Sequence, residues 1–263
     1  MKARSNIQTQ NTETRDSVED VNRSFKSAVE VMAKSGYKIP DNVTVSVDPN
    51  LPFMGYTMPT RRGFNIVVAG GAVGSSMLEG LLVHEMSHIY RIHTNHPSHN
   101  AEILGEAVDH LAKKTVLREY QQKIVHDLLN DIQDLYADDI AFKAIRKMPM
   151  IRSDQMTEFL QSWVKENAAN SRDIAYDNWN NASTLAHNAR AIAQMKRHGV
   201  EDTEGRAAQA NKRFLVQVSP VIARHFDYFR NTLENLQENM TAPQYRQLLA
   251  EYLDQFLNVA ENK

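Results

Sequence analysis

Residues 81–90 read LLVHEMSHIY, which places His84, Glu85 and His88 within a run of apolar residues. At about 100° per residue, positions four apart on an α-helix lie about 40° apart, so both imidazoles project to one side. Neutral histidine is a good ligand for zinc, and Glu85 lies between the two candidate ligands as a candidate general base. The spacing therefore predicts a metal-binding helix whose carboxylate accepts a proton from water.

The residues around this motif predict an α+β fold. A helical period over residues 18–35, with Gly36 as C-cap, predicts a first helix. Three β-rich runs follow it, two of them paired as a hairpin, at residues 43–47, 53–58 and 64–69. The motif helix extends to about Ile92, and most of the chain after it has a helical period. We expect a small, mostly antiparallel sheet with the active-site helix, followed by a mainly helical C-terminal part.

The domain organisation follows from these elements. Residues 1–15 are polar and are expected to form a disordered lead. Residues 16–150 hold the predicted sheet and the motif helix, so we expect them to form the catalytic domain. Residues 151–263 are expected to form a helical C-terminal subdomain that packs against it.

Composition excludes several classes of function. The chain carries 30 basic and 32 acidic residues, so its net charge of -2 offers no basic field for nucleic acid. It has no cysteine, which leaves His, Asp and Glu as the plausible metal ligands. The N-terminus lacks the apolar core of a secretory signal, and polar groups interrupt the most apolar stretch, residues 66–90. We therefore expect a cytoplasmic protein without membrane insertion.

Residues 52–146 resemble the zincin metallopeptidases, and within them the gluzincin branch. The resemblance rests on the His-Glu-x-x-His helix, the strand at residues 64–69 and a later helix that brings the third ligand. It implies zinc as the cofactor and peptides or proteins as substrates. It also implies that an extended substrate pairs with an edge strand near Ile66 to Ala69. The metzincin subgroup is a poor match, because Arg91 and Thr94 stand where that subgroup has glycine and histidine.

The third metal ligand is sought among the acidic residues of later helices. Asp134-Leu-Tyr-Ala-Asp138 is similar to the Glu-x-x-Ala-Asp signature of the CaaX-processing and heat-shock metallopeptidases. The resemblance implies that Asp134 binds the metal and that Asp138 orients a ligand histidine. Two features depart from that family, since Asp replaces Glu and the transmembrane helices are missing. Glu106 and Asp131 are the alternative third ligands.

Two further sets of residues have less definite roles. The loop after the motif helix contains three histidines, namely His93, His96 and His99. They form a second metal site, line the cleft, or belong to a solvated loop. A metallopeptidase also benefits from a donor that stabilises the tetrahedral oxyanion. The candidates for that donor are Tyr176, His187 and His225, and the sequence does not select among them.

The sequence thus predicts a zinc-dependent metallopeptidase in which His84, His88 and Asp134 bind the metal and Glu85 moves the proton. The alternative is a catalytically silent zincin-like fold that binds metal, or none, and acts as a protein-interaction scaffold. The presence of Glu85 favours the enzyme, because the residue that the chemistry needs is in place.

Overall fold

The computed structural model describes residues 3–146 and 153–261. The first helix, α1 (Ala3–Lys34), begins inside the segment that we expected to be a disordered lead. It ends at Lys34, two residues before Gly36, the predicted cap. Gly36 has a φ of 92°, and the N–H of the next residue, Tyr37, donates to the carbonyl of Met32 at 2.9 Å. Glycine suits this position because a positive φ costs it little.

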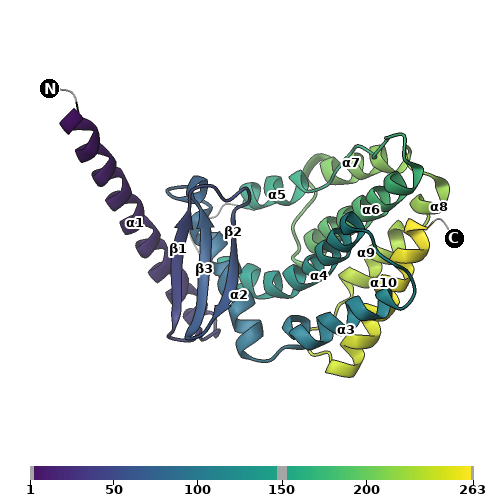
Figure 1. The fold of residues 1–263 in the computed structure, drawn as a ribbon, viewed down its shortest axis with the longest axis horizontal. Helices are drawn as coiled ribbons and strands as arrows, with labels where there is room; N and C mark the ends of the chain where they lie inside the picture. Colours follow the sequence, from purple (N-terminus) through teal and green to yellow (C-terminus); the bar gives the residue numbers. More distant parts are fainter. Residues whose placement is uncertain (1–2, 147–152, 262–263) are drawn as a thin grey trace. The chain divides into compact units, whose positions relative to one another are not determined.

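The three strands lie in the order β1-β3-β2, with bounds Val43–Asp48 for β1, Gly55–Thr60 for β2 and Gly63–Ala69 for β3 (Figure 1). The hairpin of β2 and β3 is antiparallel, as expected, whereas β1 pairs with β3 in parallel. The expectation of an α+β fold is confirmed, but the sheet is mixed and not mostly antiparallel. Residues 49–54 connect β1 to β2, which are not neighbours in the sheet. Strand β3 lies between them.

This order also corrects the expected edge strand. We expected residues near Ile66 to Ala69 to form an open edge, but they belong to β3, which is hydrogen-bonded on both sides. The outer strands of the described sheet are β1 and β2. The motif helix contacts both β2 and β3, and its contact with β2 is the more extensive.

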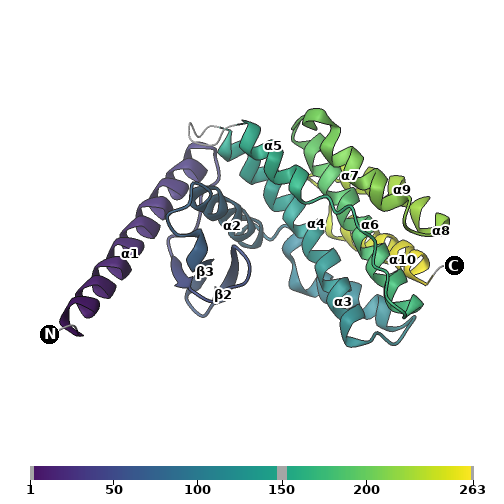
Figure 2. The same ribbon diagram turned by 90° about the horizontal axis from the view of Figure 1, so that it is seen from above.

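Helices α1 and α2 (Leu78–His93) cover one face of the sheet (Figure 2). Ile66 and Val68 point into this layer and are fully buried. Helix α2 lies close to β2. A Cβ atom added at Gly55 of β2 would lie 3.3 Å from a methyl group of Leu81 in α2. The opposite face carries a row of polar side chains in which Thr44, Asn65 and Ser46 are hydrogen-bonded.

The chain divides into two compact units. The first comprises residues 1–94 and 137–151, and the second comprises residues 95–136 and 152–263. Residues 95–136 thus group with the second unit, whereas we expected them in the catalytic domain. The other expected boundary, between residues 150 and 151, lies outside the described residues.

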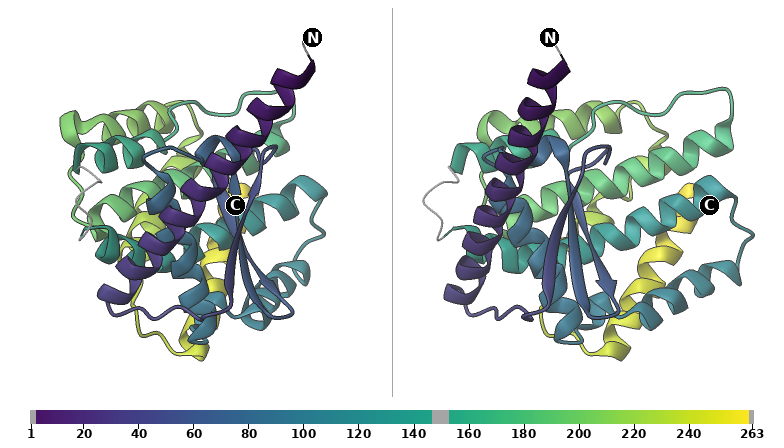
Figure 3. Two further views of the ribbon diagram at one scale, coloured as in Figure 1. Left: turned by 90° about the vertical axis from the view of Figure 1, so that its left-hand side faces the viewer. Right: turned by 60° about the vertical axis from the view of Figure 1, so that its left-hand side comes forward.

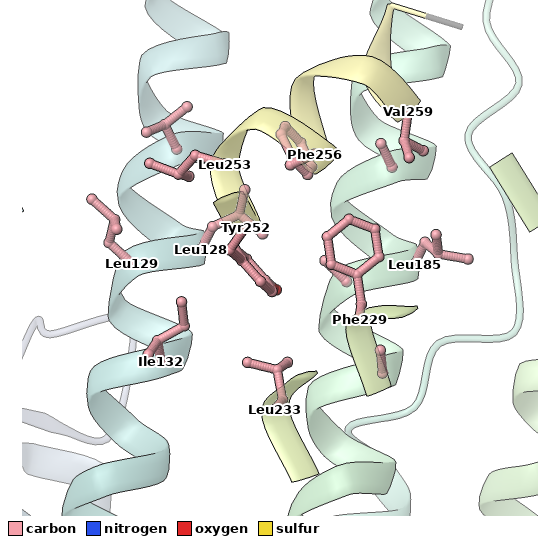
Figure 4. Close-up of a cluster of buried hydrophobic side chains, with 14 of the residues drawn as sticks. Leu128, Leu129, Ile132, Leu185, Phe229, Leu233, Tyr252, Leu253, Phe256 and Val259 are labelled. Atoms are coloured by element: carbon pink, nitrogen blue, oxygen red, sulfur yellow. The ribbon is translucent and has the colours of Figure 1, made fainter. Parts of the chain in front are cut away.

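The second unit is helical in its described part (Figure 3). It contains α3 (Ala101–Ala112), the N-terminal part of α4 (Glu119–Ile145), α5 (Ser153–Ser162), α6 (Ile174–Arg197), α7 (Arg206–Leu215), α8 (Pro220–Ala223), α9 (Phe226–Glu234) and α10 (Ala242–Ala260). Its core is formed by apolar side chains of α4, α6, α9 and α10 (Figure 4). Labelled members are Leu128, Leu129, Ile132, Leu185, Phe229, Leu233, Tyr252, Leu253, Phe256 and Val259.

Candidate metal centre

The two histidines of the motif converge on one side of α2. The Nε2 atoms of His84 and His88 lie 3.1 Å apart, and the two rings are nearly perpendicular, at 79°. A zinc ion with tetrahedral geometry and nitrogen ligands at about 2.0–2.1 Å holds those nitrogens about 3.3 Å apart. The spacing of the imidazoles therefore fits two ligands of one zinc ion.

The burial pattern of α2 explains why both imidazoles face the same way. Leu82, Met86 and Ile89 are fully buried on the side of the helix that packs against the rest of the first unit. His84 and His88 lie on the opposite side, because 100° per residue separates the two sets. The imidazole of His84 remains 25% exposed. Packing of the apolar side thus sets the direction of the metal-binding side.

Glu85 lies on the flank between the core and the histidines and is 5% exposed. Its backbone carbonyl accepts a hydrogen bond of 3.2 Å from the hydroxyl of Thr57 in β2. This bond joins the motif turn to the neighbouring strand. Glu85 therefore belongs to a helical turn that is hydrogen-bonded to the sheet. The same turn bears both imidazoles.

Asp138, which the resemblance implies to orient a ligand histidine, lies beside the motif. Its Oδ1 atom is 2.7 Å from Nδ1 of His84, and its side chain is only 6% exposed. When Nδ1–H donates to this carboxylate, the lone pair of His84 is on Nε2, the nitrogen that faces His88. A carboxylate that orients an imidazole in this way is typical of zinc sites.

Asp134 completes a group of three potential ligands. Helix α4 passes from residue 136 to residue 137 without a break, so Asp134 stands one turn before Asp138 on the same side. One ligand atom each from His84, His88 and Asp134 lies within 4.8 Å of the others, and this group could hold a metal ion. Two imidazoles and one carboxylate are a donor set that catalytic zinc sites use.

The alternative third ligands have other partners. Glu106 of α3 pairs with Arg246 of α10, with Oε2 at 2.5 Å from Nε, on an exposed surface. The hydrogen bond from Arg246 lowers the pKa of the Glu106 carboxyl. Asp131 lies 3.4 Å from Nδ1 of His187 and 3.9 Å from Nη1 of Arg190. Neither acid belongs to the group of His84, His88 and Asp134.

The histidines that follow α2 have local partners. The hydroxyl of Ser98, which is fully buried, lies 2.7 Å from Nδ1 of both His96 and His99. The Nε2 atom of His96 lies 2.9 Å from the carbonyl of Glu238. These contacts organise the short turn at Pro97–His99. The loop is thus held by its own histidines, and they are not members of the metal-binding group.

Of the three candidate oxyanion donors, His187 is the one next to the acidic turn of α4. Tyr176 packs on Tyr120 with ring centroids 5.0 Å apart and is 41% exposed. The Nδ1 atom of His225 is hydrogen-bonded to the side-chain amide of Gln255 at 2.8 Å. Burial, and then the charge of Arg224, lower the pKa of the His225 imidazole.

Sequence reasoning did not single out Arg190. The Nη2 atom of this buried residue lies 3.3 Å from Oδ2 of Asp134, and its guanidinium stacks on Trp163 at 4.4 Å from the ring centre. Trp163 is half-buried and supports this charge from one side. The signal for Arg190 was weak: an arginine with alanines on both sides in the helix of residues 174–197.

Comparison with known proteins identifies the family of this chain. Residues 13–258 match the family described as "Family of unknown function (DUF5781)", so the chain belongs to that family. No curated protein and no solved structure matches the chain. None of the helices in the described part combines the length and apolar character that a membrane crossing requires.

Proposed function

We propose that this chain is a zinc-dependent metallopeptidase that hydrolyses peptide bonds. The observation that carries the proposal is the pair of Nε2 atoms 3.1 Å apart on α2, with Asp138 at Nδ1 of His84. A histidine on an ordinary surface helix does not require a buried carboxylate to fix the orientation of its ring. Asp134 supplies the third donor, and the set leaves one position of a tetrahedral ion open.

Each residue of the motif has a distinct task in this proposal. A bound zinc ion would supply the Lewis acid that polarises a scissile carbonyl and activates water. His84, His88 and Asp134 hold the ion, and Asp138 keeps Nε2 of His84 directed at it. Glu85 accepts the proton of the attacking water and donates it to the leaving amine.

The open edge of β2 is the place where an extended substrate would pair. Strand β2 is an outer strand of the described sheet and lies next to α2. In an antiparallel pair, alternate backbone groups point away from the partner strand, so β2 offers donors and acceptors to a further strand. Tyr56 and Met58 are 38% and 42% exposed and would contact its side chains.

The test compares the wild-type protein with Glu85→Gln and His84→Ala. We expect about one zinc ion per chain in the wild type and in Glu85→Gln, and a loss of zinc from His84→Ala. Cleavage of an unstructured protein, followed by mass spectrometry, should fall by about 10²- to 10⁴-fold in Glu85→Gln. If the wild type and Glu85→Gln both bind zinc but neither cleaves the substrate, the result would favour the scaffold. Absence of zinc from the wild type would refute the metallopeptidase.

A further inference from the structure

Arg190 makes contacts that bear on the proposed third ligand. It lies on α6, and its side chain is only 5% exposed. Its Nη2 atom is 3.3 Å from Oδ2 of Asp134, and its Nη1 atom is 3.9 Å from Oδ1 of Asp131. Asp131 and Asp134 are three residues apart on α4 and therefore share a side of that helix. One guanidinium thus bridges two acids on successive turns.

The chemistry of the guanidinium suits this arrangement better than an ammonium would. Arginine presents several donors in a rigid planar fork, so one side chain contacts two carboxylates at set angles. The ring of Trp163 lies 4.4 Å from Cζ of Arg190 and supports the plane of the fork from one side. The direction of the guanidinium is therefore restricted by packing as well as by charge.

Net stability is a weak reason for an ion pair whose guanidinium is buried and whose carboxylate is 32% exposed. Removing a guanidinium and a carboxylate from water costs free energy that their attraction only partly returns. An apolar side chain of the same size could fill the space between α4 and α6 at similar or lower cost. What the pair does supply is a set direction for the Asp134 carboxylate.

Resting on the proposed function, we propose that Arg190 is a positioning residue that orients Asp134 for metal binding. A carboxylate has two oxygen atoms. Oδ2 of Asp134 contacts Arg190, and Asp134 also offers one ligand atom to the group with His84 and His88. Aspartate is one methylene shorter than the glutamate of the resembling family, so fewer of its rotamers bring an oxygen atom within reach of the metal. Arg190 selects that rotamer before the metal arrives.

The experiment measures zinc affinity of the full-length chain by competition with a chromophoric chelator. Arg190→Met should weaken zinc binding by about 10- to 100-fold, which is the usual effect of losing a group that orients a ligand. Arg190→Lys keeps the charge without the fork and should fall between wild type and Arg190→Met. Arg197→Met is the matched control, because Arg197 lies on the same helix and bonds backbone carbonyls of residues 233, 234 and 236.

A double-mutant cycle separates orientation of Asp134 from general support of the fold. A chain that carries Asp134→Ala keeps only the weak zinc binding of His84 and His88. In that chain the change Arg190→Met should have no further effect on this residual affinity, measured with a chelator of matching weaker affinity. An equal loss in both backgrounds would overturn the proposal, because Arg190 would then act elsewhere. If Arg190→Met does not fold, as judged by circular dichroism, Arg190→Lys carries the same cycle.

The outcomes for Arg190 and for the metallopeptidase are distinct. Zinc binding that depends on His84 but is unchanged in Arg190→Met and Arg190→Lys would overturn the role of Arg190 alone. A wild-type protein that binds no zinc would overturn both proposals.

Discussion

The Nδ1 atom of His84 lies 2.7 Å from Oδ1 of Asp138, although 54 residues separate them in sequence. Asp138 is almost fully buried, and a buried carboxylate requires a partner. The bond joins α2 to α4 and leaves Nε2 of His84 facing Nε2 of His88. The contact with Asp138 thus orients His84 so that its Nε2 and that of His88 form a pair of nitrogen donors.

The bond between His84 and Asp138 predicts an effect on metal affinity. Asp138→Asn should weaken zinc binding by about 10- to 100-fold, because an amide no longer offers His84 a charged acceptor. Chelator competition measures the change. Asp127→Asn is the control, since the exposed Asp127 lies on the same helix and pairs with Lys123. Equal affinities for wild type and Asp138→Asn would show that this bond does not support metal binding.

The assignment of the third ligand predicts different effects for two acids. Asp134→Ala should remove one donor and abolish tight zinc binding, whereas Glu106→Ala should leave the zinc content unchanged. The reason is that Asp134 belongs to the group with His84 and His88, and Glu106 pairs with Arg246. Metal analysis of both purified variants measures the outcome. The reverse result would assign the ligand to Glu106.

Asp202 predicts a dependence of stability on pH. Burial would raise the pKa of its carboxyl, but hydrogen bonds from the amides of Ala208 and Ala207 and from Gln161 lower it below 3.8. The ionised form is thus the one that the fold stabilises, so this contribution is present above about pH 4 and is lost as the pH falls through the lowered pKa. Asp202→Asn removes the titrating group.

Urea unfolding at about pH 5 and about pH 3 measures this effect. The free energy of unfolding should decrease more for the wild type than for Asp202→Asn over that interval. Parallel decreases in the two proteins would show that Asp202 does not contribute to acid sensitivity.

The core of the second unit predicts a large effect of one substitution. Phe256 is fully buried, and its ring lies 5.5 Å from that of Trp179. Phe256→Ala should lower the free energy of unfolding by about 3–5 kcal/mol, because it leaves a cavity among packed side chains. Ile174→Ala, at a site 77% exposed, should change it by less than about 0.5 kcal/mol. Similar urea midpoints for the two variants would contradict this view of the core.

Local sequence patterns were enough to predict several elements. The spacing of apolar residues and histidines indicated α2, because a helical period places residues on a side without reference to the rest of the chain. Gly36 indicated the end of α1, and the β-rich runs indicated three strands, since turn and strand preferences act within a few residues. The α+β class follows from these elements alone.

Long-range packing decided what such patterns do not encode. The position of β3 between β1 and β2 depends on which strands meet, so the expected edge near Ile66 to Ala69 was wrong. The contact of Arg190 with Asp134 joins helices that are distant in sequence, and no local period specifies it. The sequence by itself determined that two imidazoles and a carboxylate share one turn of helix, because that spacing is local. Only tertiary structure decided that Asp138 meets His84, because burial brings together groups that the chain holds far apart.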